Sequence, residues 1–121
     1  ETLAKPPLSP PGIIFPIVWS ILYTLMGISF AQLEINNLHD NDTKKVYYEQ
    51  LIVNLSWPIF FFTFKWRLFS ILIILLLLIL VIRMIRVFYR KEKLAGLLQI
   101  PYLLWVSFAT YLNIFTYFLN N

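Results

Sequence analysis

The chain has 121 residues, of which 60% are hydrophobic and only 13% are charged. A soluble domain of this size cannot bury so much apolar surface, so the composition indicates a membrane protein. The net charge of +4 is modest, and the basic residues lie at the ends of apolar segments. This placement suits lipid headgroups and gives no indication of a nucleic-acid partner. Because the chain contains no cysteine, disulfide frameworks and thiolate chemistry are excluded.

Four apolar segments are long enough to cross a bilayer, which takes about 20 residues. Each must be a helix, because backbone groups that face lipid have to be satisfied within their own segment. The sequence therefore predicts an all-α, polytopic membrane helix bundle that forms one domain over residues 1–121. In chain order, the predicted spans are residues 13–32, 46–64, 68–89 and 94–119.

Proline is concentrated before the first span and recurs inside three of the spans. The prolines before the first span are Pro6, Pro7, Pro10 and Pro11. The internal ones are Pro16, Pro58 and Pro101, and an internal proline frees a carbonyl group and bends a helix. One interpretation is three bent helices around a cavity. The other is ordinary kinking, which is common in transmembrane helices.

The distribution of lysine and arginine predicts the orientation. Three basic residues lie on the side of the N-terminus, the 65–67 turn and the C-terminus, whereas the opposite side carries seven: Lys44, Lys45, Arg83, Arg86, Arg90, Lys91 and Lys93. The positive-inside rule then places loops 35–45 and 89–93 in the cytoplasm and the C-terminus outside the cell membrane. The three arginines share one helix face, where a stripe that snorkels toward anionic lipid explains them better than a voltage sensor.

Three of the four tryptophans are predicted to lie deeper than an interfacial belt. Trp66, in the 65–67 turn, fits such a belt. Trp19, Trp57 and Trp105 lie within spans, where an indole N–H needs a hydrogen-bond partner. Tyr23 follows Trp19 by four residues and therefore shares its helix face.

Small and polar residues occur at a similar depth. Asn54 lies three residues before Trp57, on the same face. In the fourth span a stripe recurs every four residues, formed by Pro101, Trp105, Ala109 and Asn113. Two interpretations of the amides stay open: hydrogen bonds between helices, or polar groups in a pocket for a large, flat, mostly apolar ligand. Separately, the four-residue spacing of Gly27 and Ala31 predicts a close helix–helix contact.

Three segments carry a resemblance to a known family. They read KPPLSPPG…VWSILYTLMG, NLSWPIFF and LAGLLQIPYLLWVSFATYLN. On these motifs the chain resembles bacterial-type members of the translocator protein family, also called the tryptophan-rich sensory or peripheral-type benzodiazepine receptor family. The resemblance implies a five-helix bundle that often forms homodimers. With only four predicted spans, we expect the family's first helix to be missing from this sequence and to precede Glu1.

The resemblance also implies the ligands and the site. Family members bind porphyrins, other tetrapyrroles and synthetic benzodiazepine-site ligands, and bacterial members break down protoporphyrin in light. The two tryptophans tied to that reaction correspond by motif to Trp19 and Trp105. The expected ligand-binding residues, with Asn113 added from the stripe, are Trp19, Tyr23, Asn54, Trp57, Trp105, Ala109 and Asn113. The prolines Pro6, Pro10 and Pro11 would form either a stiff loop over the pocket mouth or a rigid lead into the first helix.

On this resemblance we expect a membrane protein that binds tetrapyrroles, has a sensory or protective role and breaks porphyrin down in light. The alternatives are a transporter of porphyrins, lipids or sterols, and a non-catalytic assembly factor. A proton-coupled carrier would need a carboxylate inside the membrane, but Glu34 and Glu49 lie near span ends. The only histidine, His39, falls in the predicted cytoplasmic loop, and we expect neither a metal site nor a cofactor. The sterol pattern is absent, because no basic residue follows Tyr111 or Tyr117.

Overall fold

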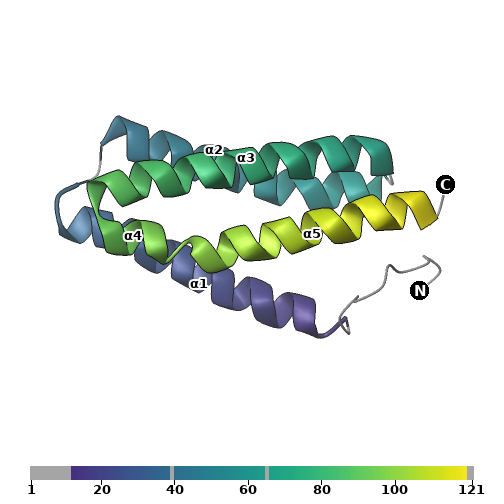
Figure 1. Ribbon diagram of the computed structural model, residues 1–121, viewed down its shortest axis with the longest axis horizontal. Coiled ribbons are helices and arrows are strands. Elements are labelled where there is room, and N and C mark those ends of the chain that lie inside the picture. The colour runs from purple at the N-terminus through teal and green to yellow at the C-terminus, as the bar shows by residue number, and fades with distance from the viewer. Residues whose placement is uncertain (1–11, 39, 65, 120–121) are drawn as a thin grey trace.

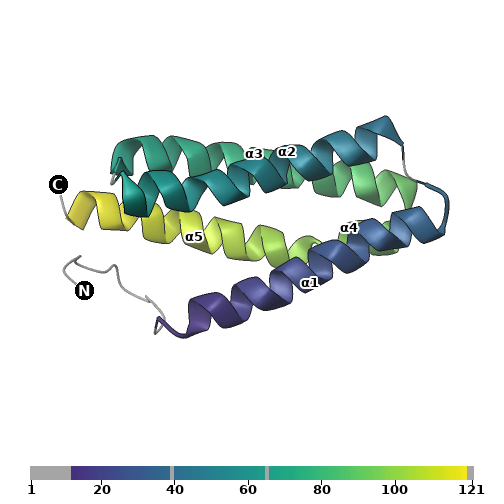
Figure 2. The same cartoon turned by 180° about the vertical axis from the view of Figure 1, so that it is seen from behind.

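The structure is a computed structural model that describes residues 12–38, 40–64 and 66–119. Its helices run side by side along one long axis, as two opposite views show (Figures 1 and 2). In chain order they are α1 (Ile14–Ile35), α2 (Asn41–Pro58), the π-helix η1 (Ile59–Thr63), α3 (Arg67–Lys91), α4 (Lys93–Leu97) and α5 (Ile100–Leu119). No strand occurs in the described ranges, which confirms the predicted all-α bundle.

Among the described residues, three helical segments are long and apolar enough to cross a membrane: Ile14–Ile35, Arg67–Lys91 and Lys93–Leu119. They match the first, third and fourth predicted spans. The second predicted span, residues 46–64, is divided between α2 and η1. Because α2 begins with the polar segment Asn41–Lys45 and ends at Pro58, its own 18 residues are less apolar than the predicted span.

The predicted bending of helices by internal prolines is wrong for Pro16, which lies in the first turn of a regular helix, whereas Pro58 and Pro101 lie where the helical form of their spans changes. Pro16 is the third residue of α1 and Pro101 the second of α5, positions where the missing N–H would have had no helical partner. Pro58 is the last residue of α2, and the chain continues as the wider η1, where the Phe64 N–H donates to the Ile59 carbonyl over 3.1 Å. The second and fourth spans therefore change helical form next to Pro58 and Pro101, whereas α1 continues as a regular helix from Pro16.

The loop before α2 is fixed to the junction of α3 and α4. Asp40 and Thr43 form a reciprocal capping box, in which the Thr43 N–H donates to Asp40 Oδ1 over 2.9 Å. The second carboxylate oxygen of Asp40 pairs with Lys91 Nζ at 2.5 Å. Beside this pair, Asn36 Nδ2 donates to Glu92 Oε2 over 2.7 Å. The loops at 35–45 and 89–93 thus meet at one end of the bundle, as the sequence predicts.

This ion pair predicts a dependence of stability on pH. The hydrogen bond from Lys91, followed by the one from the Thr43 backbone, lowers the pKa of Asp40 from 3.8 to about 2. A carboxyl with a depressed pKa in the folded state stabilises that state above its unfolded pKa, and the contribution is lost as the pH falls from about 4 to about 2. Thermal unfolding in detergent should show a steeper loss over this interval for the parent than for Asp40→Asn. Parallel curves would contradict the pairing.

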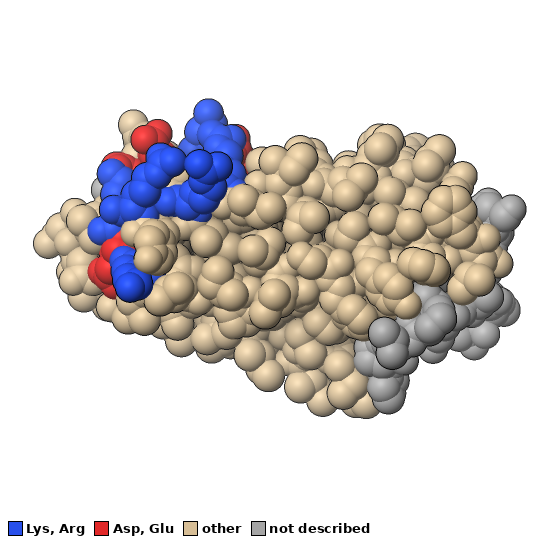
Figure 3. All heavy atoms as spheres, viewed as in Figure 1, with Lys and Arg blue, Asp and Glu red and all other residues tan. Residues whose placement is uncertain are grey.

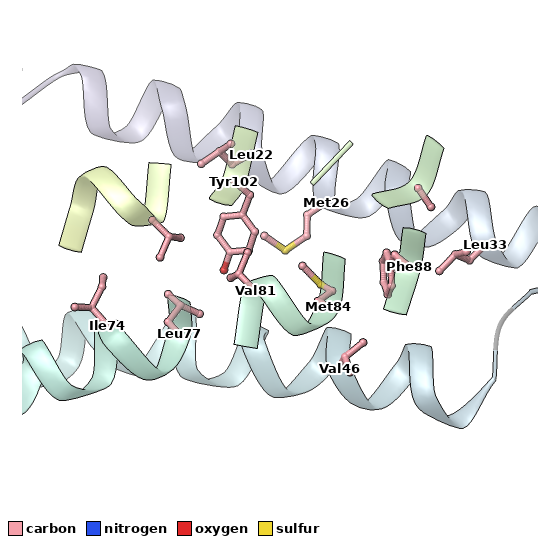
Figure 4. Packing of buried hydrophobic residues seen from close by; sticks show 12 residues of the cluster. Leu22, Met26, Leu33, Val46, Ile74, Leu77, Val81, Met84, Phe88 and Tyr102 are labelled. Atoms are coloured by element: carbon pink, nitrogen blue, oxygen red, sulfur yellow. The ribbon is translucent and has the colours of Figure 1, made fainter. Parts of the chain in front are cut away.

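The apolar core is built around α3. One face of this helix buries Ile74, Leu77, Val81, Met84 and Phe88. Figure 4 shows them facing Leu22, Met26 and Leu33 of α1, Val46 of α2 and Tyr102 of α5. The other face of α3 is exposed, so this helix is both the centre of the packing and a surface for lipid.

The two helical glycines have opposite surroundings. Gly27 is exposed, and a β-carbon added there would have no neighbour within 4 Å among the described residues. The predicted helix–helix contact at Gly27 and Ala31 is therefore wrong within one chain. Gly96 of α4 is instead buried against α3, where an added β-carbon would lie 2.6 Å from Tyr89 Cβ. Spacing alone did not show which face of a helix packs.

Candidate functional site

The two tryptophans expected to be catalytic meet between α1 and α5. The rings of Trp19 and Trp105 lie 6.4 Å apart, with their planes at 90°. Tyr23 stacks on Trp19 with a centroid distance of 5.6 Å, and Phe15 lies edge-on to Trp105 at 5.6 Å. Both indoles are half-buried and pack against the core. Two motifs far apart in sequence thus form one aromatic cluster.

A chain of hydrogen bonds joins this cluster to α2. The Tyr23 hydroxyl donates to Asn54 Oδ1 over 2.5 Å, and Asn54 Nδ2 donates to the Tyr102 hydroxyl over 2.7 Å. The Tyr102 hydroxyl in turn donates to Gln50 Oε1 over 2.7 Å. Asn54 therefore bridges α1 and α5 through its amide oxygen and nitrogen. Of the two interpretations given for the amides, this contact fits hydrogen bonding between helices.

Tyr102 and Gln50 were not predicted as site residues. Tyr102 is 1% exposed, and besides its hydrogen bonds its ring lies edge-on to Trp19 at 6.3 Å. Gln50 is fully buried and lies one turn before Asn54 on α2. A signal for both existed: each places a polar atom one helical turn from a predicted site residue inside an apolar span.

Trp57 and Asn113 form a second polar contact, between α2 and α5. Trp57 Nε1 donates to Asn113 Oδ1 over 3.1 Å, which gives this deep indole the partner it was expected to need. Asn113 is 3% exposed, and its Nδ2 has no hydrogen-bond partner among the described residues. Ala109 lies one turn before Asn113 and is half-buried against the core.

Trp105 differs from Trp57 in that its Nε1 is buried without a hydrogen-bond partner among the described residues. A buried donor without a partner costs about 1–3 kcal/mol of stability, so such groups call for an explanation. With Asn113 Nδ2, two buried nitrogen atoms of α5, about two turns apart, are donors without a partner in the described part of the chain. Aromatic faces with a few unused donors are suited to a flat apolar ligand that carries carbonyl or carboxylate oxygens.

The remaining predicted residues lie away from this cluster. Trp66 is exposed in the turn before α3 and stacks on Phe64 at 5.0 Å, as expected of an interfacial residue. The prolines Pro6, Pro10 and Pro11 and the only histidine, His39, lie outside the described residues. Within the described ranges no group of three His, Cys, Asp or Glu side chains could hold a metal ion.

Comparison with known proteins identifies the family. The model of the TspO/MBR family matches residues 1–119. The tryptophan-rich protein TspO of Chlorobaculum tepidum is 38% identical over 115 residues, which cover 93% of this chain and 73% of that protein. The tryptophan-rich sensory protein of Cereibacter sphaeroides is 31% identical, covering 93% and 71%, and the human translocator protein is 32% identical, covering 92% and 68%. The resemblance seen in the motifs is thereby confirmed, and the chain belongs to the TspO/MBR family of multi-pass membrane proteins.

Proposed function

We propose that this protein binds tetrapyrroles within the bilayer and acts as a sensory or protective protein that breaks down protoporphyrin in light. The observation that carries the proposal is the perpendicular contact of Trp19 with Trp105, whose indole N–H is buried and has no partner among the residues that the structure describes. The name of the Cereibacter sphaeroides relative, a tryptophan-rich sensory protein, supports the sensory role. Membrane location is supported by the three apolar helices and by the family.

The cluster offers a porphyrin two kinds of interaction. The macrocycle is a large aromatic plane, and stacked or edge-on contacts with Trp19, Trp105 and Tyr23 would each add about 0.5–1.5 kcal/mol to the gain from burial. The side-chain carboxylates of protoporphyrin are acceptors, and Trp105 Nε1 and Asn113 Nδ2 are donors without partners in the described part of the chain. A charge-assisted hydrogen bond at either donor would remove the cost of leaving it unpaired.

Proton-coupled transport, the main alternative, finds less support in the placement of acidic groups. Glu49 is ion-paired with Arg83 at 3.1 Å, and Glu34 is exposed near the end of α1. The other described carboxylates, Asp40, Asp42 and Glu92, lie at the same end of the bundle. Within the described residues the buried interior of the bundle thus holds amides, phenols and indoles rather than a carboxylate.

The proposal is tested by titrating the protein, reconstituted in nanodiscs, with protoporphyrin in the dark. Binding should quench tryptophan emission and saturate at a fixed ratio of porphyrin to protein, because Trp19 and Trp105 lie in the proposed site. Empty nanodiscs measure the partition of porphyrin into lipid. Trp66→Phe, which alters only the interfacial indole, should bind like the parent. Quenching that never saturates, or that Trp66→Phe abolishes, would show that the porphyrin meets the protein through lipid alone.

We also propose that loops 35–45 and 89–93 face the cytoplasm and that the C-terminus lies outside. The count of seven basic residues in and near these two loops, against three in the sequence segments assigned to the opposite side, supports this orientation. Because the chain lacks cysteine, Asn41→Cys and Asn120→Cys each introduce a single label site. In intact cells an impermeant thiol reagent should label Asn120→Cys and leave Asn41→Cys unlabelled until the membrane is opened. The reverse pattern would overturn the orientation.

A further inference from the structure

Basic side chains gather on the surface at one end of the bundle, over the C-terminal part of α3 and the adjoining α2 and α4 (Figure 3). Two of them are paired with acidic side chains of the same chain at the surface. Arg83 donates to Glu49 Oε1 at 3.1 Å, and Lys91 pairs with Asp40. The charge that remains on this surface of α3 therefore belongs to Arg86 and Arg90.

Arg86 and Arg90 point away from the protein core. Met84 and Phe88 are fully buried and lie two residues before Arg86 and Arg90, respectively, and a step of two residues on a helix is a rotation of about 200°. Both arginines are exposed, and neither forms an ion pair with any residue that the structure describes. Two guanidinium groups one turn apart are thus free to receive an anion from outside the chain.

The same outward face of α3 continues as an apolar row. Leu72, Leu76 and Ile79 are 58%, 43% and 62% exposed, and they precede Arg83, Arg86 and Arg90 in steps of three and four residues. From Leu72 to Arg86 the helix rises about 21 Å, which is close to half of the roughly 40–45 Å bilayer with its headgroup regions. The face therefore has the dimensions of one lipid molecule, with an anion-binding end above a chain-binding row.

We propose that this face of α3 is a binding site for an anionic phospholipid, separate from the tetrapyrrole site. The lipid phosphate lies between Arg86 and Arg90, and an acyl chain lies along Leu72, Leu76 and Ile79. One guanidinium group can donate two parallel hydrogen bonds to two oxygens of the same phosphate. An ammonium group lacks this geometry, so such a site favours arginine over lysine. A lipid with net negative charge is preferred over a zwitterionic one, because the headgroup cation of the latter opposes the two arginines.

The test compares phosphatidylglycerol with phosphatidylcholine of the same acyl chains, added to the purified protein in neutral detergent. Bound lipid is counted by native mass spectrometry. Phosphatidylglycerol should bind more tightly, and Arg86→Gln with Arg90→Gln should weaken it by about tenfold or more, since each charge near the surface contributes roughly a fivefold change. Replacing both arginines by lysine should recover only part of the binding.

The matched control removes the same charge elsewhere at this end. Lys44→Gln with Lys45→Gln, on exposed positions of α2, should leave phosphatidylglycerol binding within about twofold of the parent. Glycerol phosphate, which has the headgroup anion without chains, should not compete. The proposal is overturned if the lysine pair weakens binding as much as the arginine pair, if both lipids bind equally, or if glycerol phosphate displaces the lipid.

Discussion

Replacing either Trp105 or Trp19 by phenylalanine should leave protoporphyrin binding nearly intact but remove most of its light-driven breakdown. Phenylalanine keeps most of the apolar contact, and aromatic pairing is worth about 0.5–1.5 kcal/mol beyond burial, so the affinity should fall by about tenfold at most. The photochemistry requires more than contact. An excited porphyrin must take an electron or hydrogen atom from a neighbour, and a benzene ring is a far poorer donor than an indole.

The geometry sharpens this expectation for Trp105. Its indole N–H has no hydrogen-bond partner among the described residues, and its ring meets Trp19 at 6.4 Å. Once Trp105 is oxidised, Trp19 is near enough to replace the lost electron, and Tyr23 stacks behind it at 5.6 Å. Loss of either tryptophan therefore breaks the same short chain of donors, and the double variant should be little worse than each single one.

The measurement is a time course of porphyrin absorbance under illumination, with dark binding determined separately. Trp66→Phe is the matched control, because it removes an indole that stacks on Phe64 in the turn before α3 and lies away from the Trp19–Trp105 pair. If Trp105→Phe and Trp19→Phe both bleach bound porphyrin at the parent rate, the two indoles are structural. Breakdown driven by these two indoles would then be excluded, while the binding proposal would stand on the dark titration alone.

The meeting of Trp19 with Trp105 was predictable from motifs, whereas the hydrogen bonds around them were not. A helical period places Tyr23 beside Trp19 and Asn54 beside Trp57, since these are contacts within one helix. That the amide of Asn54 reaches Tyr102 rather than the indole of Trp57 depends on how α2 and α5 rotate against each other. The rotation of one helix against another depends on packing over the whole core, so it cannot be predicted from the spacing of residues within one helix.

The same limit explains the errors over proline and glycine. Each proline was correctly seen as a disturbance of a helix, but its effect depends on whether it lies in the first turn, as Pro16 and Pro101 do, or at the end, as Pro58 does. Gly27 fitted a spacing rule for close helix contacts and is exposed. Gly96 belongs to no small-residue spacing pattern. It nevertheless lies against Tyr89 of α3, because the short α4 is held between α1 and α3.

Gly96→Ala should destabilise the bundle strongly, because Tyr89 of α3 leaves no room for a β-carbon at this position. The added β-carbon would lie 2.6 Å from Tyr89 Cβ, 2.8 Å from its Cα and 2.9 Å from its N, so α3 and α4 would have to move apart. Retreat of α4 is opposed on its other side, where Ser29 of α1 donates to the Ala95 carbonyl over 2.6 Å. Overpacking of this kind costs about 1–3 kcal/mol, and more where the backbone itself must shift.

Gly27→Ala is the matched control, because it makes the same chemical change in a helix with open space around it. Alanine is favoured over glycine in a helix by roughly 0.5–1 kcal/mol, so Gly27→Ala should be as stable as the parent or slightly more stable. Thermal unfolding in detergent should then separate the two variants, with Gly96→Ala losing several degrees. Helix propensity favours alanine at Gly27 and does not disfavour it at Gly96, so a loss of stability in Gly96→Ala alone is assigned to the contact of α4 with Tyr89. Equal melting temperatures would mean that α4 does not approach α3 as closely as described, and that the turn at Leu98 and Gln99 is free to carry α4 away from the bundle.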